Sequence, residues 1–246
     1  MLFDLQAKGR ATAVKIIYGF LAILIGGGLV LFGVGGSGFG LLNTDQNNGG
    51  ANSGSSLVQQ ATKTEKKAGA PDLPGATVKL TTAQQASLWA AAARLRFQAA
   101  SAGFDTNSGQ YTEVGKQQLQ EASTDWLRYL SLQKKGAVDL TLAKLMAQAY
   151  GDGGLADGQN GVKAWEIVVA AEPTGPNYAQ LALAAYLAGN NKVGDKASAK
   201  ALADIPSAER ATLKNQFIAA KAQFKLKQQQ AAKQSSQGSS ISPLGG

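Results

Sequence analysis

The sequence contains no cysteine and no histidine among its 246 residues. Without histidine there is no imidazole for a Ser-His-Asp or Cys-His nucleophile, for a metal site or for a charge switch near neutral pH. Without cysteine there is no thiolate chemistry, no disulfide and no lipoprotein anchor. These absences exclude most hydrolase and metalloenzyme designs, so we expect neither an enzyme nor a cofactor.

Acidic residues are few, with 16 Asp and Glu against 24 Lys and Arg, and the net charge is +8. A basic chain often binds nucleic acid, but these basic residues lack the interleaved aromatic side chains on which bases stack. We therefore expect no nucleic-acid partner.

Charged residues are absent between Ile16 and Gly36. A helix of that length spans about 31 Å, the thickness of the hydrocarbon core of a bilayer. We therefore predict a transmembrane helix over residues 16–36 that holds the chain in the lipid bilayer. A cleaved signal peptide is the alternative, because Gly36-Ser37-Gly38 offers small residues for a peptidase, although its apolar region is usually only about 7–15 residues.

The charges that flank this span set its orientation. Lys8, Arg10 and Lys15 precede the span, whereas the first basic residue after it is Lys63. The positive-inside rule then places residues 1–15 in the cytoplasm and the C-terminal domain outside it, in a single-pass protein of the cell membrane. Four glycines at heptad spacing permit a second membrane helix to approach, and so permit oligomerisation, without requiring it: Gly19, Gly26, Gly33 and Gly40.

The segment from Gly33 to Gly38, GVGGSG, matches the dinucleotide fingerprint G-x-G-x-x-G. That fingerprint needs a strand before it, a helix after it and an acidic residue about 20 positions further on. Here a long apolar run precedes the motif and an Asn- and Gly-rich stretch follows it. We interpret the match as an accident of composition.

Composition divides the rest of the chain. Residues 37–80 are rich in Gly, Ser, Asn and Pro and predict a flexible, disordered linker, and residues 233–246 predict a disordered tail. The folded part is then residues 81–232, which is long enough for one hydrophobic core. Its apolar spacing is helical, and no segment alternates with a period of two for long, so we predict an all-α fold without strands.

The helices of this part are predicted from apolar spacing and from breaks at Gly and Pro. The first predicted helix follows Thr82, and Gln85 lies three positions after Thr82, as in a capping box. The predicted ranges are 83–102, 112–135, 139–150, 161–171, 177–188, 194–203 and 207–230.

An internal repeat organises these helices. Ala143-x-Leu145-x3-Ala149-Tyr150-x2-Gly153 recurs as Ala179-x-Leu181-x3-Ala185-Tyr186-x2-Gly189. The following helix repeats as well, because Lys163-Ala164 with Ala170 and Pro173 matches Lys196-Ala197 with Ala203 and Pro206. Each copy is a helix, a glycine turn, a second helix and a proline stop. Ala86-x-Leu88-x3-Ala92 and Ala122-x3-Trp126 form a looser first copy.

A helix pair of about 34 residues with this pattern resembles the tetratricopeptide repeat. The layout as a whole resembles tetratricopeptide-type, single-span membrane proteins of high-GC Gram-positive bacteria, with degenerate motifs. The resemblance implies about three helical-hairpin repeats followed by a C-terminal capping helix.

Repeat arrays of this kind bind extended segments on a concave surface formed by the first helix of each pair. We therefore expect a scaffold for protein–protein or peptide binding, with a role in protein export or envelope assembly and an unidentified protein or peptide partner. The predicted peptide groove consists of Thr141, Lys144, Gln148, Asn177, Gln180, Gln84, Gln85 and Arg94.

The final predicted helix is amphipathic. Leu213, Phe217, Ala220 and Phe224 form one apolar face, and lysines cover much of the remainder. We expect this helix to cap the last repeat. The alternative is that its basic surface contacts anionic lipid or an acidic partner.

Two loops contain possible calcium ligands. The loop from Asp105 to Tyr111 places oxygens as in an EF-hand, but Gln110 replaces the required glycine and Lys116 the bidentate glutamate. Asp152 and Asp157 lie in a second Gly-rich loop with a weaker pattern. We interpret both loops as connectors built on Asx turns and expect no metal.

An enzyme of the cell envelope is the alternative function. It would use carboxylates such as Asp125, Glu166 or Glu172 as acid and base. These residues form no recognisable catalytic constellation in the sequence, so binding remains the preferred function.

Overall fold

The structure, a computed structural model, describes residues 53–133 and 138–238. The predicted span 16–36, with its glycines, lies outside these residues, as do the linker up to residue 52 and the tail from residue 239. No helix of the described part is both long enough and apolar enough to cross a bilayer. Eight α-helices dominate this part of the chain, which confirms the all-α prediction at this level.

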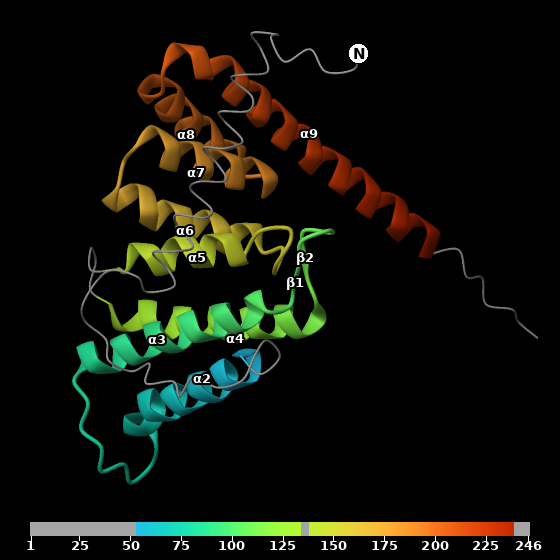
Figure 1. The fold of residues 1–246 in the computed structure, drawn as a ribbon. Coiled ribbons are helices and arrows are strands. Elements are labelled where there is room, and N and C mark those ends of the chain that lie inside the picture. Colours follow the sequence, from blue (N-terminus) through green and yellow to red (C-terminus); the bar gives the residue numbers. More distant parts are fainter. Residues whose placement is uncertain (1–52, 134–137, 239–246) are drawn as a thin grey trace, which may run out of the picture. The chain divides into compact units, whose positions relative to one another are not determined.

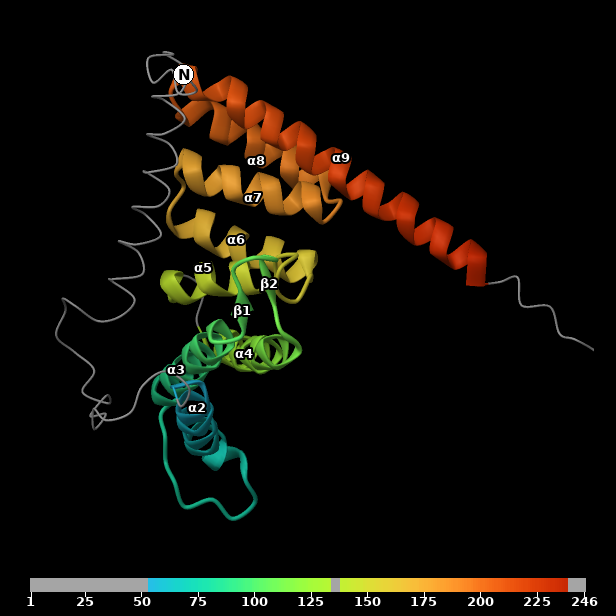
Figure 2. The ribbon, with the colours of Figure 1, turned by 45° about the vertical axis from the view of Figure 1, so that its right-hand side comes forward.

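Short connections join most of these helices into pairs. α3 packs along α4, α5 along α6 and α7 along α8 (Figures 1 and 2). α2 packs on α3, α6 contacts α7, and α9 lies mainly on α7. The bounds are α2 Ser53–Gly69, α3 Thr82–Ser101, α4 Glu113–Leu132, α5 Leu140–Ala149, α6 Gly158–Ala171, α7 Gly175–Leu187, α8 Asn191–Asp204 and α9 Ser207–Gly238.

Polar side chains fix where these helices start. At six of them an Asp, Thr or Asn accepts a hydrogen bond from the backbone N–H three residues further on, which satisfies a donor that the helix leaves free. The predicted capping box exists one residue earlier than expected, between Thr81 and Gln84. The other five caps are Thr112, Asp139, Asp157, Thr174 and Asn190.

The linker prediction is wrong over Ser53–Gly69, where the chain forms α2. This helix buries Ala61 and Ala68 completely. Its contacts with α3 stabilise this polar segment, because most of the stability of a helix in a protein comes from packing. The folded part therefore begins well before residue 81.

Two further predictions need correction. A two-stranded antiparallel hairpin, β1 Phe104–Asp105 with β2 Gln110–Tyr111, lies between α3 and α4, so the described part is not free of strands. α9 continues to Gly238, into the predicted disordered tail. Its run of Gln, Ala and Lys has good helix propensity, which explains the extension.

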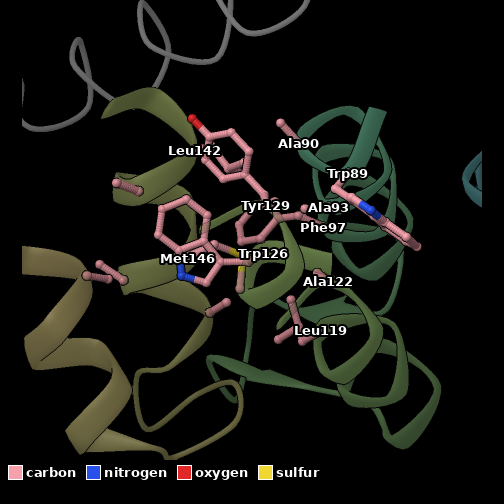
Figure 3. Packing of buried hydrophobic residues seen from close by; sticks show 14 of the residues in the cluster. Trp89, Ala90, Ala93, Phe97, Leu119, Ala122, Trp126, Tyr129, Leu142 and Met146 are labelled. Atoms are coloured by element: carbon pink, nitrogen blue, oxygen red, sulfur yellow. The ribbon is translucent and has the colours of Figure 1, made fainter. Parts of the chain in front are cut away.

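The hydrophobic core extends through all the helix pairs. In its first half, residues of α3, α4, α5 and α6 form one cluster together with Ala68 of α2, and Figure 3 shows part of it. Trp126 and Tyr129 of α4 have their ring centroids 5.5 Å apart within it. A second cluster continues through α6, α7 and α8 to Leu213 and Phe217 of α9. The residues labelled in Figure 3 are Trp89, Ala90, Ala93, Phe97, Leu119, Ala122, Trp126, Tyr129, Leu142 and Met146.

In each repeated pair the tyrosine of the first helix lies against a glycine of the second helix. A Cβ atom at Gly194 of α8 would overlap the ring of Tyr186 of α7, so α7 and α8 need glycine here to approach this closely. One at Gly161 of α6 would lie 3.4 Å from the Cβ of Tyr150 of α5, which is ordinary van der Waals contact.

Candidate binding surface

Two residues of the predicted peptide groove meet in the structure. Lys144 of α5 forms an ion pair with Glu172, with Nζ 2.7 Å from Oε2. The side-chain amide of Asn177 in α7 donates to the backbone oxygen of Glu172 at 3.0 Å and to its Oε2 at 3.3 Å. Lys144 and Asn177 lower the pKa of the Glu172 carboxyl by hydrogen bonding and by the positive charge of the lysine. Glu172 therefore links α5 to α7 at the end of α6.

The predicted residues of α3 are also engaged within the chain. Arg94 pairs with Asp139, the residue that caps α5. Gln84 belongs to the capping box, and the amide of Gln85 donates to the Ala68 oxygen at 3.1 Å and to Asp72 at 3.0 Å. Arg94 and Gln85 thus connect α3 to other parts of the chain, whereas Gln84 closes the start of α3 itself.

The other predicted residues are exposed on their helices. Thr141 and Gln148 lie on α5 and Gln180 lies on α7. None of the three lines either of the two hollows described next. Gln85 alone among the eight predicted residues contributes to one.

The larger hollow lies at the C-terminal ends of α5 and α7, and we call it the hairpin-end groove. Its volume is about 480 Å³, within the range of about 300–1,000 Å³ that ligand sites occupy. Most of the residues that line it are apolar or are glycines. The lining residues are Ala147, Tyr150, Gly151, Asp152, Ala156, Gly158, Gln159, Gly161, Ala184, Leu187, Ala188, Phe224 and Lys227.

Close contacts at the helix ends shape this groove. A Cβ atom at Gly158 of α6 would come within 2.7 Å of the Cβ of Ala188, so α6 begins directly against the end of α7. Gly189 has a φ of +75°, a conformation that glycine adopts without strain, and the ring of Phe224 of α9 covers it. The groove floor is therefore made of tight backbone turns, and α9 forms one wall.

A polar contact holds this wall in place. Lys227 of α9 has its Nζ 2.6 Å from Oδ2 of Asp152, in the loop between α5 and α6. Gln223 donates to the same carboxylate at 3.3 Å. Asp152, which the sequence suggested as a weak calcium ligand, thus pairs with a lysine instead of standing free in its loop.

The second hollow, of about 350 Å³, lies where α2 ends beside α3 and α4. The guanidinium of Arg128 stacks over the ring of Trp89, 4.5 Å from its centroid. Aromatic, basic and acidic groups all line it, so it favours no single ligand chemistry. Its lining residues are Gly69, Asp72, Gln85, Trp89, Arg128, Ser131 and Leu132.

A charged cluster is buried beneath α2. Arg96 of α3 is 7% exposed, and its guanidinium binds both oxygens of Glu65 of α2, at 2.6 and 2.8 Å. It also donates to Gln118 of α4 at 2.8 Å and to Thr62 of α2 at 3.2 Å. The hydrogen bond to Glu65 raises the pKa of Arg96, so this residue stays charged in the interior.

Asp125 of α4 completes the cluster. It is 2% exposed, and its Oδ2 is buried without a hydrogen-bond partner. Burial, followed by the nearby Glu65 carboxylate, raises the pKa of Asp125 to about 8, against the smaller opposing effects of Arg96 and Arg128. The carboxyl therefore carries a proton at neutral pH.

The carboxylates considered for catalysis do not share a site. Asp125 is buried under α2, Glu172 pairs with Lys144, and Glu166 lies exposed on α6. None of them lines either hollow.

The loops with possible calcium ligands use their carboxylates locally. Asp105 accepts from the Asn107 backbone at 2.9 Å and from the Ser108 hydroxyl at 2.7 Å, which is the predicted Asx turn, closing the β1–β2 hairpin. Asp157 caps α6 and accepts from the Asn160 side chain at 2.7 Å. Over residues 53–133 and 138–238, no group of three or more acidic residues is placed to hold a metal ion.

Comparison with protein-family models, with curated proteins and with solved structures finds no match for this chain. The functional argument therefore depends on the geometry described above.

Sequence reasoning missed both the hairpin-end groove and the charged cluster. The groove depends on α9 turning back over the ends of earlier helices, and no local pattern encodes that path. The cluster depends on α2, whose sequence reads as a linker. Arg96 itself carried a signal, because it lies in an Ala-rich, apolar helix, and a charged side chain that is buried there needs a partner of opposite charge.

Proposed function

We propose that this chain is a membrane-anchored helical-repeat scaffold that binds an apolar peptide segment of another protein, outside the cytoplasm. The anchor is the predicted span 16–36, oriented by the basic residues before it. The observation that carries the binding proposal is the hairpin-end groove, because it is apolar, open and of ligand size.

The repeated helix pairs support a tetratricopeptide-like interpretation. In both sequence copies a tyrosine at the end of the first helix packs against a glycine of the second. Repeat proteins of this type commonly bind peptides, so architecture and groove favour the same function. We propose the hairpin-end groove as the binding surface because the charged side chains of the predicted groove already form pairs within the chain.

Peptides selected from a random library on the full chain provide the test. Ala184→Phe fills the groove, and we expect it to weaken binding by about tenfold or more, because it occupies the space that apolar side chains of the peptide would fill. Ala203→Phe adds the same ring to an exposed position of α8 and is the matched control. Peptides that bind Ala184→Phe as tightly as the unmodified chain would show that the groove is not the site.

The same peptides test the surface predicted from the sequence. Gln148→Ala combined with Gln180→Ala changes the exposed face formed by the first helices and leaves the Lys144–Glu172 pair and the hairpin-end groove intact. We expect affinity to be unchanged. A loss of affinity in this variant, with none in Ala184→Phe, would assign binding to the first-helix face instead.

A further inference from the structure

α9 contains a fourth, degenerate copy of the first-helix motif. Ala211-x-Leu213-x3-Phe217-Ile218 aligns without a gap with Ala179-x-Leu181-x3-Ala185-Tyr186 and with the equivalent segment of α5. In this alignment Ile218 corresponds to Tyr150 and Tyr186. By sequence, α9 is therefore the first helix of a fourth pair.

The face of α9 that corresponds to the core face of α5 and α7 is buried, as the alignment predicts. Leu213, Phe217 and Ala220 are buried against the second core cluster. α5 and α7 also bury a second face, and the corresponding face of α9 is exposed. Tyr150 and Tyr186 are 1% and 2% exposed, whereas Ile218 is 65% exposed.

The same difference holds for the neighbouring positions. Met146 and Ala182 are completely buried, and their counterpart in α9 is the exposed Lys214. Ala143 and Ala179 are also buried, and their counterpart Ala211 is exposed. In α7 this side contacts the second helix of its own pair at Tyr186, whose hydroxyl donates to Asp195 of α8 at 2.9 Å.

No described helix takes the place of a second helix beside α9. At the position of the turn glycines Gly153 and Gly189, α9 has Lys221, and the helix continues to Gly238. The exposed residues on this side of α9 follow one another at helical spacing. We call them the open stripe, which consists of Ala211, Lys214, Ile218, Ala222 and Lys225.

We propose that the open stripe of α9 docks an acidic amphipathic helix of another protein, which completes the fourth helix pair. Small alanines on both sides of Ile218 allow a helix backbone to approach closely, as Gly194 of α8 does against Tyr186 of α7. Lys214 and Lys225 flank Ile218, and Glu209, the acidic residue of α9, lies on the opposite face. The occupant therefore carries Asp or Glu at both ends of an apolar stripe.

The charges and the small side chains select among occupants. A second copy of the chain would bring lysines against lysines, which opposes association. An interfacial helix that inserts into lipid presents a broad apolar face with Trp, Phe or Leu, whereas this stripe has one isoleucine among alanines. A helical partner of opposite charge fits both features.

A synthetic peptide of roughly 20 residues, with Leu and Ala in a helical stripe and Glu on both flanks, is the probe. A second peptide has Lys in place of each Glu. The full chain is held in nanodiscs of zwitterionic phosphatidylcholine, which keep lipid charge out of the measurement, and binding is followed by fluorescence anisotropy. We expect the Glu peptide to bind and the Lys peptide not to bind.

Charge reversal on the stripe provides the decisive comparison. Lys214→Glu with Lys225→Glu should weaken the Glu peptide by about tenfold or more and allow the Lys peptide to bind. Lys192→Glu with Lys196→Glu makes the same change of net charge on exposed positions of α8 and should leave both affinities unchanged. Ala184→Phe in the hairpin-end groove should also have no effect, so this test does not depend on the proposed binding groove.

Three results would overturn the proposal. The first is that the Glu peptide does not bind, or that the α8 control loses as much affinity as the stripe variant. Equal loss would show that binding depends only on the net charge of the chain. The second is a dimer in sedimentation analysis that Ile218→Glu dissociates, which would make a second copy the occupant. The third is competition by phosphatidylglycerol vesicles that depends on Lys214 and Lys225, which would assign the stripe to lipid.

Discussion

At the scale of single residues, the notable group is a carboxyl that burial keeps protonated. Asp125 is enclosed by Glu65 of α2, Arg96 of α3 and Arg128 of its own helix, and its pKa is raised to about 8. The sequence suggested Asp125 as a candidate catalytic acid. Its position beneath α2, away from both hollows, gives it a structural role that depends on pH.

The pH dependence has a defined sign. An unfolded Asp titrates near pH 3.9, so between about pH 4 and 8 the folded chain holds a proton that the unfolded chain has lost. The Asp125 contribution therefore lowers the free energy of unfolding as pH rises through this window. Asp125→Asn removes the titration, and we expect its melting temperature to exceed that of the unmodified chain increasingly towards pH 8.

Thermal melts of the helical circular-dichroism signal from pH 4.5 to 8 measure this effect. Glu166→Gln removes an exposed carboxylate of α6 and serves as the control, with no expected change in slope. Parallel pH curves for Asp125→Asn and the unmodified chain would show that Asp125 titrates normally.

At the scale of elements, α2 is the helix whose existence depends most on its partner. Its buried apolar contribution is two alanines, and the Glu65–Arg96 pair supplies the specific contact to α3. Removing one member of a buried ion pair leaves the other uncompensated, whereas replacing both by apolar residues is often neutral. The attachment of α2 is therefore sensitive to single substitutions at this pair.

Glu65→Ala should destabilise the docking of α2 by about 3 kcal/mol. Hydrogen–deuterium exchange of the full chain should then show faster exchange over Ser53–Gly69 and unchanged exchange over α5 to α8. Glu65→Leu with Arg96→Met should restore slow exchange, and Lys66→Ala, on the exposed side of α2, should not alter it. Unaltered α2 protection in Glu65→Ala would contradict a role for the pair in holding this helix.

The sequence predicted those elements whose signals are local. α5 to α8 follow from the repeated Ala-x-Leu and Tyr–Gly positions, with ends displaced by a few residues because the caps lie earlier than the apolar pattern indicates. α2 could not be predicted in this way, because its stability comes from Arg96, which lies far along the chain. The hairpin-end groove was missed for the same reason, since Phe224 and Lys227 reach it only through the path of α9.

At the scale of the whole molecule, the proposed anchor and the helical part belong to one chain without cysteine. This absence makes topology directly measurable, because a single introduced cysteine is labelled without background. Gln180→Cys, on the exposed side of α7, should react with a membrane-impermeant maleimide in intact bacterial cells. Gln6→Cys leaves the orienting basic residues in place and should react only after permeabilisation, because the proposed orientation puts it in the cytoplasm.

The reverse labelling pattern would place the helical part in the cytoplasm and remove the extracytoplasmic element of the proposed function. Equal labelling of both positions in intact cells, with release of the chain by alkaline carbonate, would show that residues 16–36 do not anchor it.

The reach of α9 back to Asp152 has a consequence for how the helices unfold. Stacked repeats touch only their neighbours in sequence, so they usually fray one unit at a time from an end. Lys227 and Gln223 instead connect the last helix to the loop between α5 and α6, past the whole of α7 and α8. α9 also shares the second core cluster with α6, α7 and α8. We therefore expect loss of α9 to weaken the packing of both repeated pairs, and not of its neighbour in sequence alone.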